Sequence, residues 1–253
     1  MENFLVFRLY GPMAAWGEIA VGETRRIASY PSKSALLGLV SAALGIRRDE
    51  QERLDKLTCS FTFGVKLISA GTLLKDYHTI QVPDSVGKFI FRTRRDELVM
   101  GKDPPGTIIS TREYRTDSLS VVAVRRVQTA SYTLEELKMA LMRPTFHLYL
   151  GRKSCPPSLP LCPQIISTNG IKHALDSAVF PPIFPDKNNT QDLADRMIKS
   201  KTIRYYWEDD AGDMEPEQIF ERFDQPLNRK RWQFSPRMEN MFIESKPAND
   251  KED

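Results

Sequence analysis

The sequence predicts an α+β protein: a ferredoxin-like, RRM-like domain over residues 1–150 with an excursion out of its core at about 81–106, and a smaller C-terminal β-rich unit over 151–245. Two patterns carry this prediction. Segments with strand and helix periodicity follow one another in a βαββαβ-like order. Prolines then become frequent after Pro156, which marks a change of organisation. Helices on one face of an antiparallel sheet would give such a domain.

The first strand and the first two helices follow from apolar spacing and end signals. Residues 4–10 are short, apolar and aromatic, as in a buried strand. Apolar residues recur at helical spacing from Leu36 to Leu44, and Gly45 stands where a glycine would end the helix. Residues 49–52 have the spacing of a capping box and therefore predict a second short helix.

Alternating apolar residues predict the next strands, at 61–67, 73–80, 107–115 and 119–127. Glycines and prolines punctuate the stretch between the second and third of these, Gln81 to Gly106, and Phe and Arg residues lie between them. Such a stretch does not have the pattern of a core element. We therefore expect it to leave the body of the domain as an excursion.

A third helix is expected where Thr133 and Glu136 form a capping box, with leucines on one face and Pro144 at its end. Further strands are expected at 146–150, 202–207 and 231–234. The C-terminal residues 246–253 are polar and too poor in apolar side chains to pack into a core, so we expect a disordered tail there.

Composition sets mild bounds on function. The 36 Lys and Arg residues against 33 Asp and Glu give a net charge of +3, so a nucleic-acid surface must be a local concentration of charge. Cys59, Cys155 and Cys162 have neither CxxC nor paired His spacing, so no metal, cofactor or disulfide framework is expected. The sequence has neither the apolar core of a signal peptide at its N-terminus nor an apolar run long enough to span a membrane. We therefore expect a cytoplasmic protein without a membrane partner.

Three distant segments share one chemistry: 11–17, 76–79 and 149–156. Each sets glycine or aromatic residues beside cations or hydroxyls at the end of an apolar run. Glycine allows close approach of the backbone, aromatic rings offer a stacking face, and Arg or Lys neutralises phosphate. This combination favours single-stranded RNA as the ligand.

These segments, together with the helix at 31–46 and Thr111 to Tyr114, occur in an order that resembles the Cas5 family of CRISPR-associated proteins. The resemblance covers roughly residues 1–163. Within the family, the chain is most similar to the Cas5-family subunit of the type I-E Cascade complex. It implies an RRM-like domain with a β-hairpin thumb at the 81–106 excursion and its flanks. It also implies a non-catalytic subunit that holds the 5′ handle of the CRISPR RNA, contacts the Cascade backbone subunit and the large subunit, and meets target DNA only through the complex.

The candidate RNA-binding residues combine this resemblance with local chemistry. Arg25 and Arg26 precede a helix N-terminus, where backbone N–H groups favour phosphate. The glycine turn at 151–154 offers backbone donors, two cations and a hydroxyl together. The full set is Trp16, Arg25, Arg26, Lys33, Ser34, Tyr77, His78, Arg92, Arg94, Arg95, Arg112, Tyr114, Gly151, Arg152, Lys153 and Ser154.

Several alternatives stay open on the sequence. Trp16 suits a core position as well as an RNA contact, because tryptophan is usually well buried. Arg47 and Arg48 follow a helix end and suit a helix-dipole role. Relatives in another CRISPR subtype cleave repeat RNA without metal. A base and an acid drawn from Tyr77, His78 and Tyr114 would make this chain such an endoribonuclease.

Overall fold

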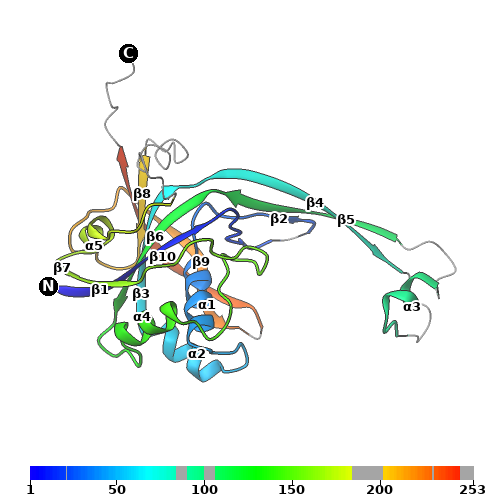
Figure 1. The fold of residues 1–253 in the computed structure, drawn as a ribbon, viewed down its shortest axis with the longest axis horizontal. Coiled ribbons are helices and arrows are strands. Elements are labelled where there is room, and N and C mark those ends of the chain that lie inside the picture. Colours follow the sequence, from blue (N-terminus) through cyan, green and yellow to red (C-terminus); the bar gives the residue numbers. More distant parts are fainter. Residues whose placement is uncertain (21, 84–89, 100–105, 184–201, 230, 246–253) are drawn as a thin grey trace, which may run out of the picture.

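The computed structural model describes residues 1–20, 22–83, 90–99, 106–183, 202–229 and 231–245. They form a seven-stranded sheet of order β7-β1-β6-β3-β8-β10-β9 and a three-stranded sheet of order β2-β5-β4. Figure 1 shows a body built on the larger sheet, from which part of the smaller sheet projects. The predicted α+β class is confirmed.

Four strands of the larger sheet and three helices follow the predicted order. Strands β7, β1, β6 and β3 are neighbours, and each pair is antiparallel. Helices α1 and α2 connect β1 to β3, and α4 connects β6 to β7. The bounds are β1 Glu2–Gly11, α1 Lys33–Ala43, α2 Gln51–Thr58, β3 Phe61–Ser69, β6 Ser118–Arg126, α4 Leu134–Met142 and β7 Gln164–Thr168.

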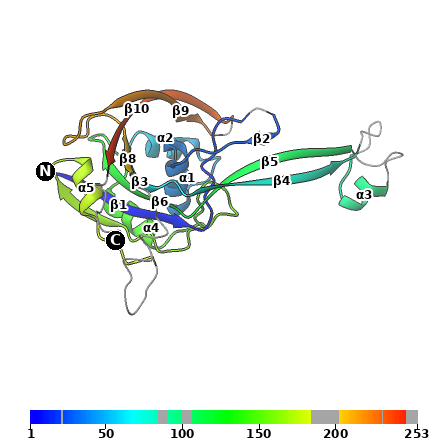
Figure 2. The ribbon, with the colours of Figure 1, turned by 90° about the horizontal axis from the view of Figure 1, so that it is seen from above.

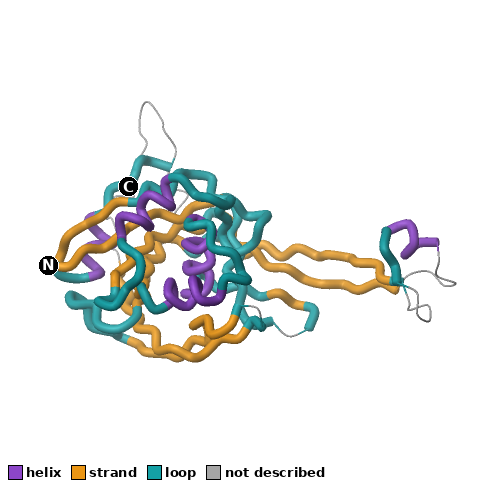
Figure 3. The backbone as a smooth tube through the Cα atoms, turned by 90° about the horizontal axis from the view of Figure 1, so that it is seen from below, coloured by secondary structure: helices purple, strands orange, loops and turns teal. Residues whose placement is uncertain are grey.

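The central strands are buried on both faces, which explains why they read as continuous apolar runs. In β1, Leu5 and Phe7 face one core with α1, α2 and α4, whereas Phe4 and Val6 face a second core with α5 (Ile171–Ser177). Figures 1 and 3 show the helices distributed around the sheet in this way. The alternation of side chains along a strand therefore serves two cores at once.

The helix ends largely follow the predicted signals. The Ser32 side chain accepts a hydrogen bond from Ala35 N (3.2 Å) at the start of α1, and Gly45 after its end has a φ of 70°. The capping box of Thr133 and Glu136 opens α4, as predicted. The predicted box at 49–52 is wrong: Glu50 Oε2 accepts from the backbone N of Arg47 (2.7 Å), because its carboxylate turns back to the preceding loop.

The C-terminal strands join the same sheet as the first 150 residues. Strand β8 (Thr202–Trp207) pairs with β3, β10 (Gln233–Ser245) with β8, and β9 (Gln218–Asn228) with β10. The expected C-terminal unit therefore does not form a sheet of its own. Figure 2 shows β9 and β10 curving over α1 and α2.

Residues 146–150 form no strand, which corrects that prediction. Phe146 N donates to Ala42 O (3.1 Å) and Thr145 N to Ala43 O (3.0 Å). Carbonyl groups at the end of a helix have no partner within the helix. The segment after α4 therefore satisfies the C-terminal end of α1 and cannot also pair with a strand.

Two predicted strands leave the body as a long hairpin. Strands β4 (Thr72–Val82) and β5 (Gly106–Thr116) pair antiparallel along their whole length, from Thr72↔Thr116 to Val82↔Gly106. We call this pair the β4–β5 ribbon. It projects from the body and carries α3 (Arg94–Val99) at its far end (Figures 1 and 2). The excursion thus begins well before Gln81, and only parts of 81–106 lie within the described residues.

Within the described ranges, no helix is long and apolar enough to cross a membrane. No cluster of three or more His, Cys, Asp or Glu residues suited to holding a metal ion occurs in that same part of the chain.

Candidate nucleic-acid interface

The two-residue strand β2 (Thr24–Arg25) brings two predicted arginines together. It pairs with β5, with Arg25 opposite Arg112, and Arg112 is opposite Asp76 of β4. Directly opposite residues in a sheet share a face, so these three side chains lie in one row. Asp76 Oδ2 lies 2.6 Å from His78 Nε2. We call this part of the smaller sheet the ribbon base.

The glycine turn at 151–155 is fixed by its backbone. Gly151 has a φ of 88°, and a Cβ there would lie 1.9 Å from Ala15 O. Leu150 N donates to Cys155 O (2.7 Å), and Ala15 N donates to Leu150 O (2.9 Å). Only glycine fits a left-handed conformation in such close contact with another backbone segment. The turn is therefore held firmly against the chain that follows β1.

Arg152 joins this turn to the ribbon base. Its Nη1 donates to Glu113 O (3.0 Å), and its guanidinium carbon lies 4.8 Å from the centre of the Tyr114 ring. Tyr114 is on the same strand face as Arg112, two residues away. Three predicted residues, Arg112, Tyr114 and Arg152, are thus contiguous, and Lys153 and Ser154 are exposed at the edge of the group.

Trp16 lies in the core. Its side chain is 2% exposed, and Ala28 N donates to Trp16 O (2.8 Å). Of the two interpretations left open by the sequence, this burial favours the structural one, since no face of the ring reaches the surface. Arg26, by contrast, is exposed beside Arg25, and its carbonyl accepts from Glu18 N (3.3 Å).

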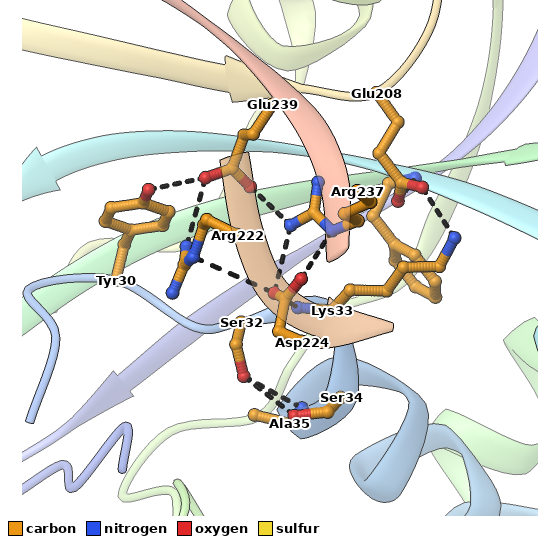
Figure 4. Close-up of polar contacts among 11 residues, drawn as sticks. Tyr30, Ser32, Lys33, Ser34, Ala35, Glu208, Arg222, Asp224, Arg237 and Glu239 are labelled. Carbon is orange, nitrogen blue, oxygen red and sulfur yellow. Dashed lines mark hydrogen bonds and ion pairs between the residues drawn. The ribbon is translucent and has the colours of Figure 1, made fainter. Parts of the chain in front are cut away.

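Lys33 and Ser34 do not form the expected phosphate site at the start of α1. Lys33 Nζ forms a buried ion pair with Glu208 Oε2 at 2.5 Å. The backbone N of Lys33 donates to Asp224 Oδ2 (2.7 Å), and Ser34 Oγ lies 3.0 Å from Ser32 Oγ. A carboxylate already occupies the position where a phosphate would accept from the helix N-terminus (Figure 4).

Asp224 belongs to a buried ionic network that joins α1 to the C-terminal strands (Figure 4). Arg237 donates to Asp224 Oδ1 (2.6 Å) and also pairs with Glu239, which accepts from Tyr30 Oη (2.6 Å). Burial raises the pKa of Glu208, although the nearby charge of Lys33 opposes this shift. A network of this kind fixes the position of α1 relative to β9 and β10.

The remaining candidates lie on the other face of the ribbon or at its far end. Tyr77 is 72% exposed on the face opposite Arg112. At the far end, Arg92 and Arg95 are exposed, and Arg94 Nη1 donates to Gln81 O (3.0 Å) and pairs with Glu97 (2.6 Å).

The register separates the proposed catalytic set. His78 is opposite Ser110 and Tyr114 is opposite Leu74, so His78 and Tyr114 are four residues apart along β5, roughly 13 Å at the rise of a strand. Tyr77 is on the other face of the ribbon. General acid–base catalysis needs both groups within hydrogen-bond reach of one substrate. This arrangement does not provide that.

Sequence reasoning missed a basic segment in the C-terminal strands. Arg229 and Trp232 lie where β9 turns toward β10, and the Trp232 ring is 5.2 Å from the guanidinium carbon of Arg48. The run from Arg229 to Trp232, in which basic residues precede a tryptophan, was a visible signal for this group.

Comparisons with known proteins show the family and the fold of this chain. Residues 4–244 match the family model described as CRISPR-associated protein (Cas_Cas5). The chain is 36% identical over 169 residues to the CRISPR system Cascade subunit CasD of Escherichia coli (strain K12), which is 64% of this chain and 70% of that protein. A chain of a solved CRISPR RNA-guided surveillance complex matches with a TM-score of 0.64 and 24% identity, over 97% of this chain and 91% of the other. A crystal structure of a Cas protein matches with a TM-score of 0.55 and 21% identity, over 96% and 95%. The two structural matches show the shared fold, and the family model spans nearly the whole chain. This protein therefore belongs to the Cas5 family of CRISPR-associated proteins.

Proposed function

We propose that this protein is a non-catalytic subunit of a type I-E Cascade complex, which binds the 5′ handle of the CRISPR RNA and caps one end of the backbone. The observation that carries the proposal is the docking of the glycine turn on the ribbon base, which joins Arg25, Arg112 and Arg152. Family membership and the likeness to CasD support it.

The chemistry of the ribbon base suits a single strand of RNA. The charge for phosphates comes from three arginines, Arg25, Arg112 and Arg152, and from the exposed Lys153. The hydroxyl of Ser154 and the turn backbone supply further donors. Among the described residues, Asp76 contacts His78 and forms no ion pair with an arginine. Phosphate contacts would position the RNA, and base identity would be read elsewhere.

The fold supports the same proposal. The order β7-β1-β6-β3, with helices between β1 and β3 and between β6 and β7, is the arrangement of a ferredoxin-like domain. We assign the β4–β5 ribbon as the thumb of the family. Its far end, with Arg92 and Arg95 exposed, would contact RNA or the neighbouring backbone subunit. The body would contact the large subunit, and target DNA would be met through the complex.

The test removes two cations from the turn. In the double variant Arg152→Ala/Lys153→Ala, binding of handle RNA should weaken, and weaken about equally for a scrambled handle, because phosphate contacts carry no sequence information. The log-log salt slope should fall by roughly 0.7 per lost contact on a single strand. Fluorescence anisotropy at several salt concentrations measures both quantities.

The matched control removes the same charge from exposed side chains of α2, a helix that lies away from the ribbon base (Figure 1), as Arg53→Ala/Lys56→Ala. It should leave the salt slope unchanged. An unchanged slope in the turn variant, or an equal loss in the control, would assign these cations to ordinary solvated surface and defeat the proposal.

A further inference from the structure

A second basic surface lies beside the ribbon base. A groove of about 900 Å³ runs between α1, the segment 146–151 and the end of the β9–β10 hairpin. Gly17 and Gly151 line one part of it, so it is continuous with the glycine turn. Its other lining side chains include the cations Arg48 and Arg229 and the aromatic rings of Tyr149 and Trp232. The carboxylates of Glu18, Glu221 and Asp224 also line it, and that of Asp224 is paired with Arg237.

Two guanidinium groups in this groove have no carboxylate partner among the described residues. Arg48 packs over the Trp232 ring, and Arg229 Nη2 donates to Ser34 O (2.6 Å). Burial lowers the pKa of Arg229, and the positive charge of Arg48 lowers it further. Two like charges held close together in a partly desolvated groove repel each other, so a bound anion would be stabilised between them.

Trp232 offers an open aromatic face beside these cations. Its side chain is 58% exposed, although the other two tryptophans, Trp16 and Trp207, are each 2% exposed. Its backbone has a φ of 53°, a conformation that a bulky residue rarely adopts. Such backbone strain is concentrated at functional sites, because the surrounding structure must hold it.

The floor of the groove is open for close approach. Gly38 lies in the middle of α1, where glycine costs about 1 kcal/mol relative to alanine. A Cβ at Gly38 would meet only Arg229 Nη2, at 3.9 Å. The missing side chain therefore leaves space beside Arg229 for a ligand to approach the helix.

We propose that this groove binds a segment of single-stranded RNA, with one base stacked on Trp232 and a phosphate held between Arg48 and Arg229. The proposal rests on the function proposed above and extends its RNA path from the glycine turn along α1. An acidic peptide would satisfy the two cations, but it would make no use of an exposed indole, whereas a nucleotide matches both features. The ribbon base offers no such face, because its tyrosine, Tyr114, is only 7% exposed.

Intrinsic fluorescence tests the stacking directly, since Trp232 is the tryptophan that solvent and ligand can reach. Titration of the purified full chain with a handle-bearing RNA oligonucleotide should quench its emission. The Trp232→Phe variant should lose the quenching and keep most of the affinity. Trp232→Ala should weaken binding roughly 5- to 160-fold, the effect of one lost base–aromatic stack.

The phosphate contact is tested with a matched pair of arginines. Arg48→Ala should lower the salt slope by roughly 0.7. Arg231→Ala removes the same charge from an exposed side chain that does not line the groove, and it should leave the slope unchanged. Thermal unfolding of each variant confirms that the chain remains folded.

The outcomes separate the two proposals. If the groove proposal fails alone, RNA still binds and still depends on Arg152 and Lys153, but it does not quench Trp232, and Arg48→Ala behaves like Arg231→Ala. If the proposed function itself fails, the wild-type chain shows no binding that depends on Arg152 and Lys153. Quenching by a polyglutamate peptide that displaces the RNA, with Trp232→Ala binding RNA normally, would also overturn the groove proposal in favour of an acidic protein partner.

Discussion

Replacing Lys33 by Met should destabilise the protein strongly without weakening its affinity for RNA. The Lys33 and Glu208 side chains are 7% and 10% exposed, and their charged atoms are 2.5 Å apart. Methionine removes the positive charge and fills a similar volume. Glu208 then keeps one other donor, Phe63 N at 3.1 Å, among the hydrogen bonds of the described residues.

The magnitude follows from the uncompensated carboxylate. Removing one partner of a buried ion pair costs about 3–5 kcal/mol in free energy of unfolding. For a chain of this size each kcal/mol lowers Tm by roughly 2–4 °C, so the loss in Tm should be about 6–20 °C. Thermal and urea unfolding followed by circular dichroism measure both quantities.

The pH dependence gives an independent check. Burial raises the pKa of Glu208, and loss of the nearby positive charge should raise it further. A carboxyl group with a raised pKa binds more protons in the folded state, so stability falls as pH rises through the interval between its unfolded and folded pKa values. The difference in stability between wild type and Lys33→Met should therefore be smaller at about pH 5 than at about pH 8.

The double variant Lys33→Met/Glu208→Gln isolates the charge. The glutamine oxygen can still accept from Phe63 N, but no charge remains, so most of the lost stability should return. A loss below about 1 kcal/mol in the single variant, or no rescue in the double variant, would refute this account of the pair. A large loss of RNA affinity in folded Lys33→Met would instead restore Lys33 as an RNA ligand.

Two further predictions concern the turn and the absence of catalysis. Gly151→Ala should cost at least about 2 kcal/mol, because it adds a collision with Ala15 O to the cost of a left-handed residue. Gly22 has a φ of 84°, and a Cβ there would have nothing within 4 Å, so Gly22→Ala should lower the free energy of unfolding in urea clearly less than Gly151→Ala does. Equal losses in the two variants would show that the collision at Gly151 is relieved. Purified protein should leave its repeat RNA uncut on denaturing gels, since the register separates His78 from Tyr77 and Tyr114. Cleavage that disappears in His78→Ala would contradict this expectation.

Local pattern was sufficient to predict most of the helices and strands. The strands at 61–67, 119–127 and 202–207 and the capping box of Thr133 and Glu136 are confirmed, because side-chain alternation and helix caps depend on residues a few positions apart. Strand β9 has no regular alternation of apolar and polar residues, since Ile219 and Phe220 are adjacent, and it was not predicted. The segment 146–150 was assigned as a strand from its apolar residues, although its start satisfies the end of α1.

The order of motifs along the chain also determined the family. Glycine turns and their neighbouring cations keep their spacing whatever the details of packing, so the Cas5 resemblance was visible before any fold was known. The sequence placed Arg112, Tyr114 and Arg152 in one candidate set, and the structure brings these three together.

Tertiary structure alone decided which candidates are accessible. Lys33 is 175 residues from Glu208 in sequence, and no local pattern announces a partner at that distance. The same holds for Trp16 in the core, for Arg48 against Trp232, and for the C-terminal strands that extend the sheet from β3. The burial of a side chain and its ion pairs depend on which distant segment packs against it, and the packing of the whole chain decides this. Helix and strand periodicity, by contrast, depends on residues a few positions apart.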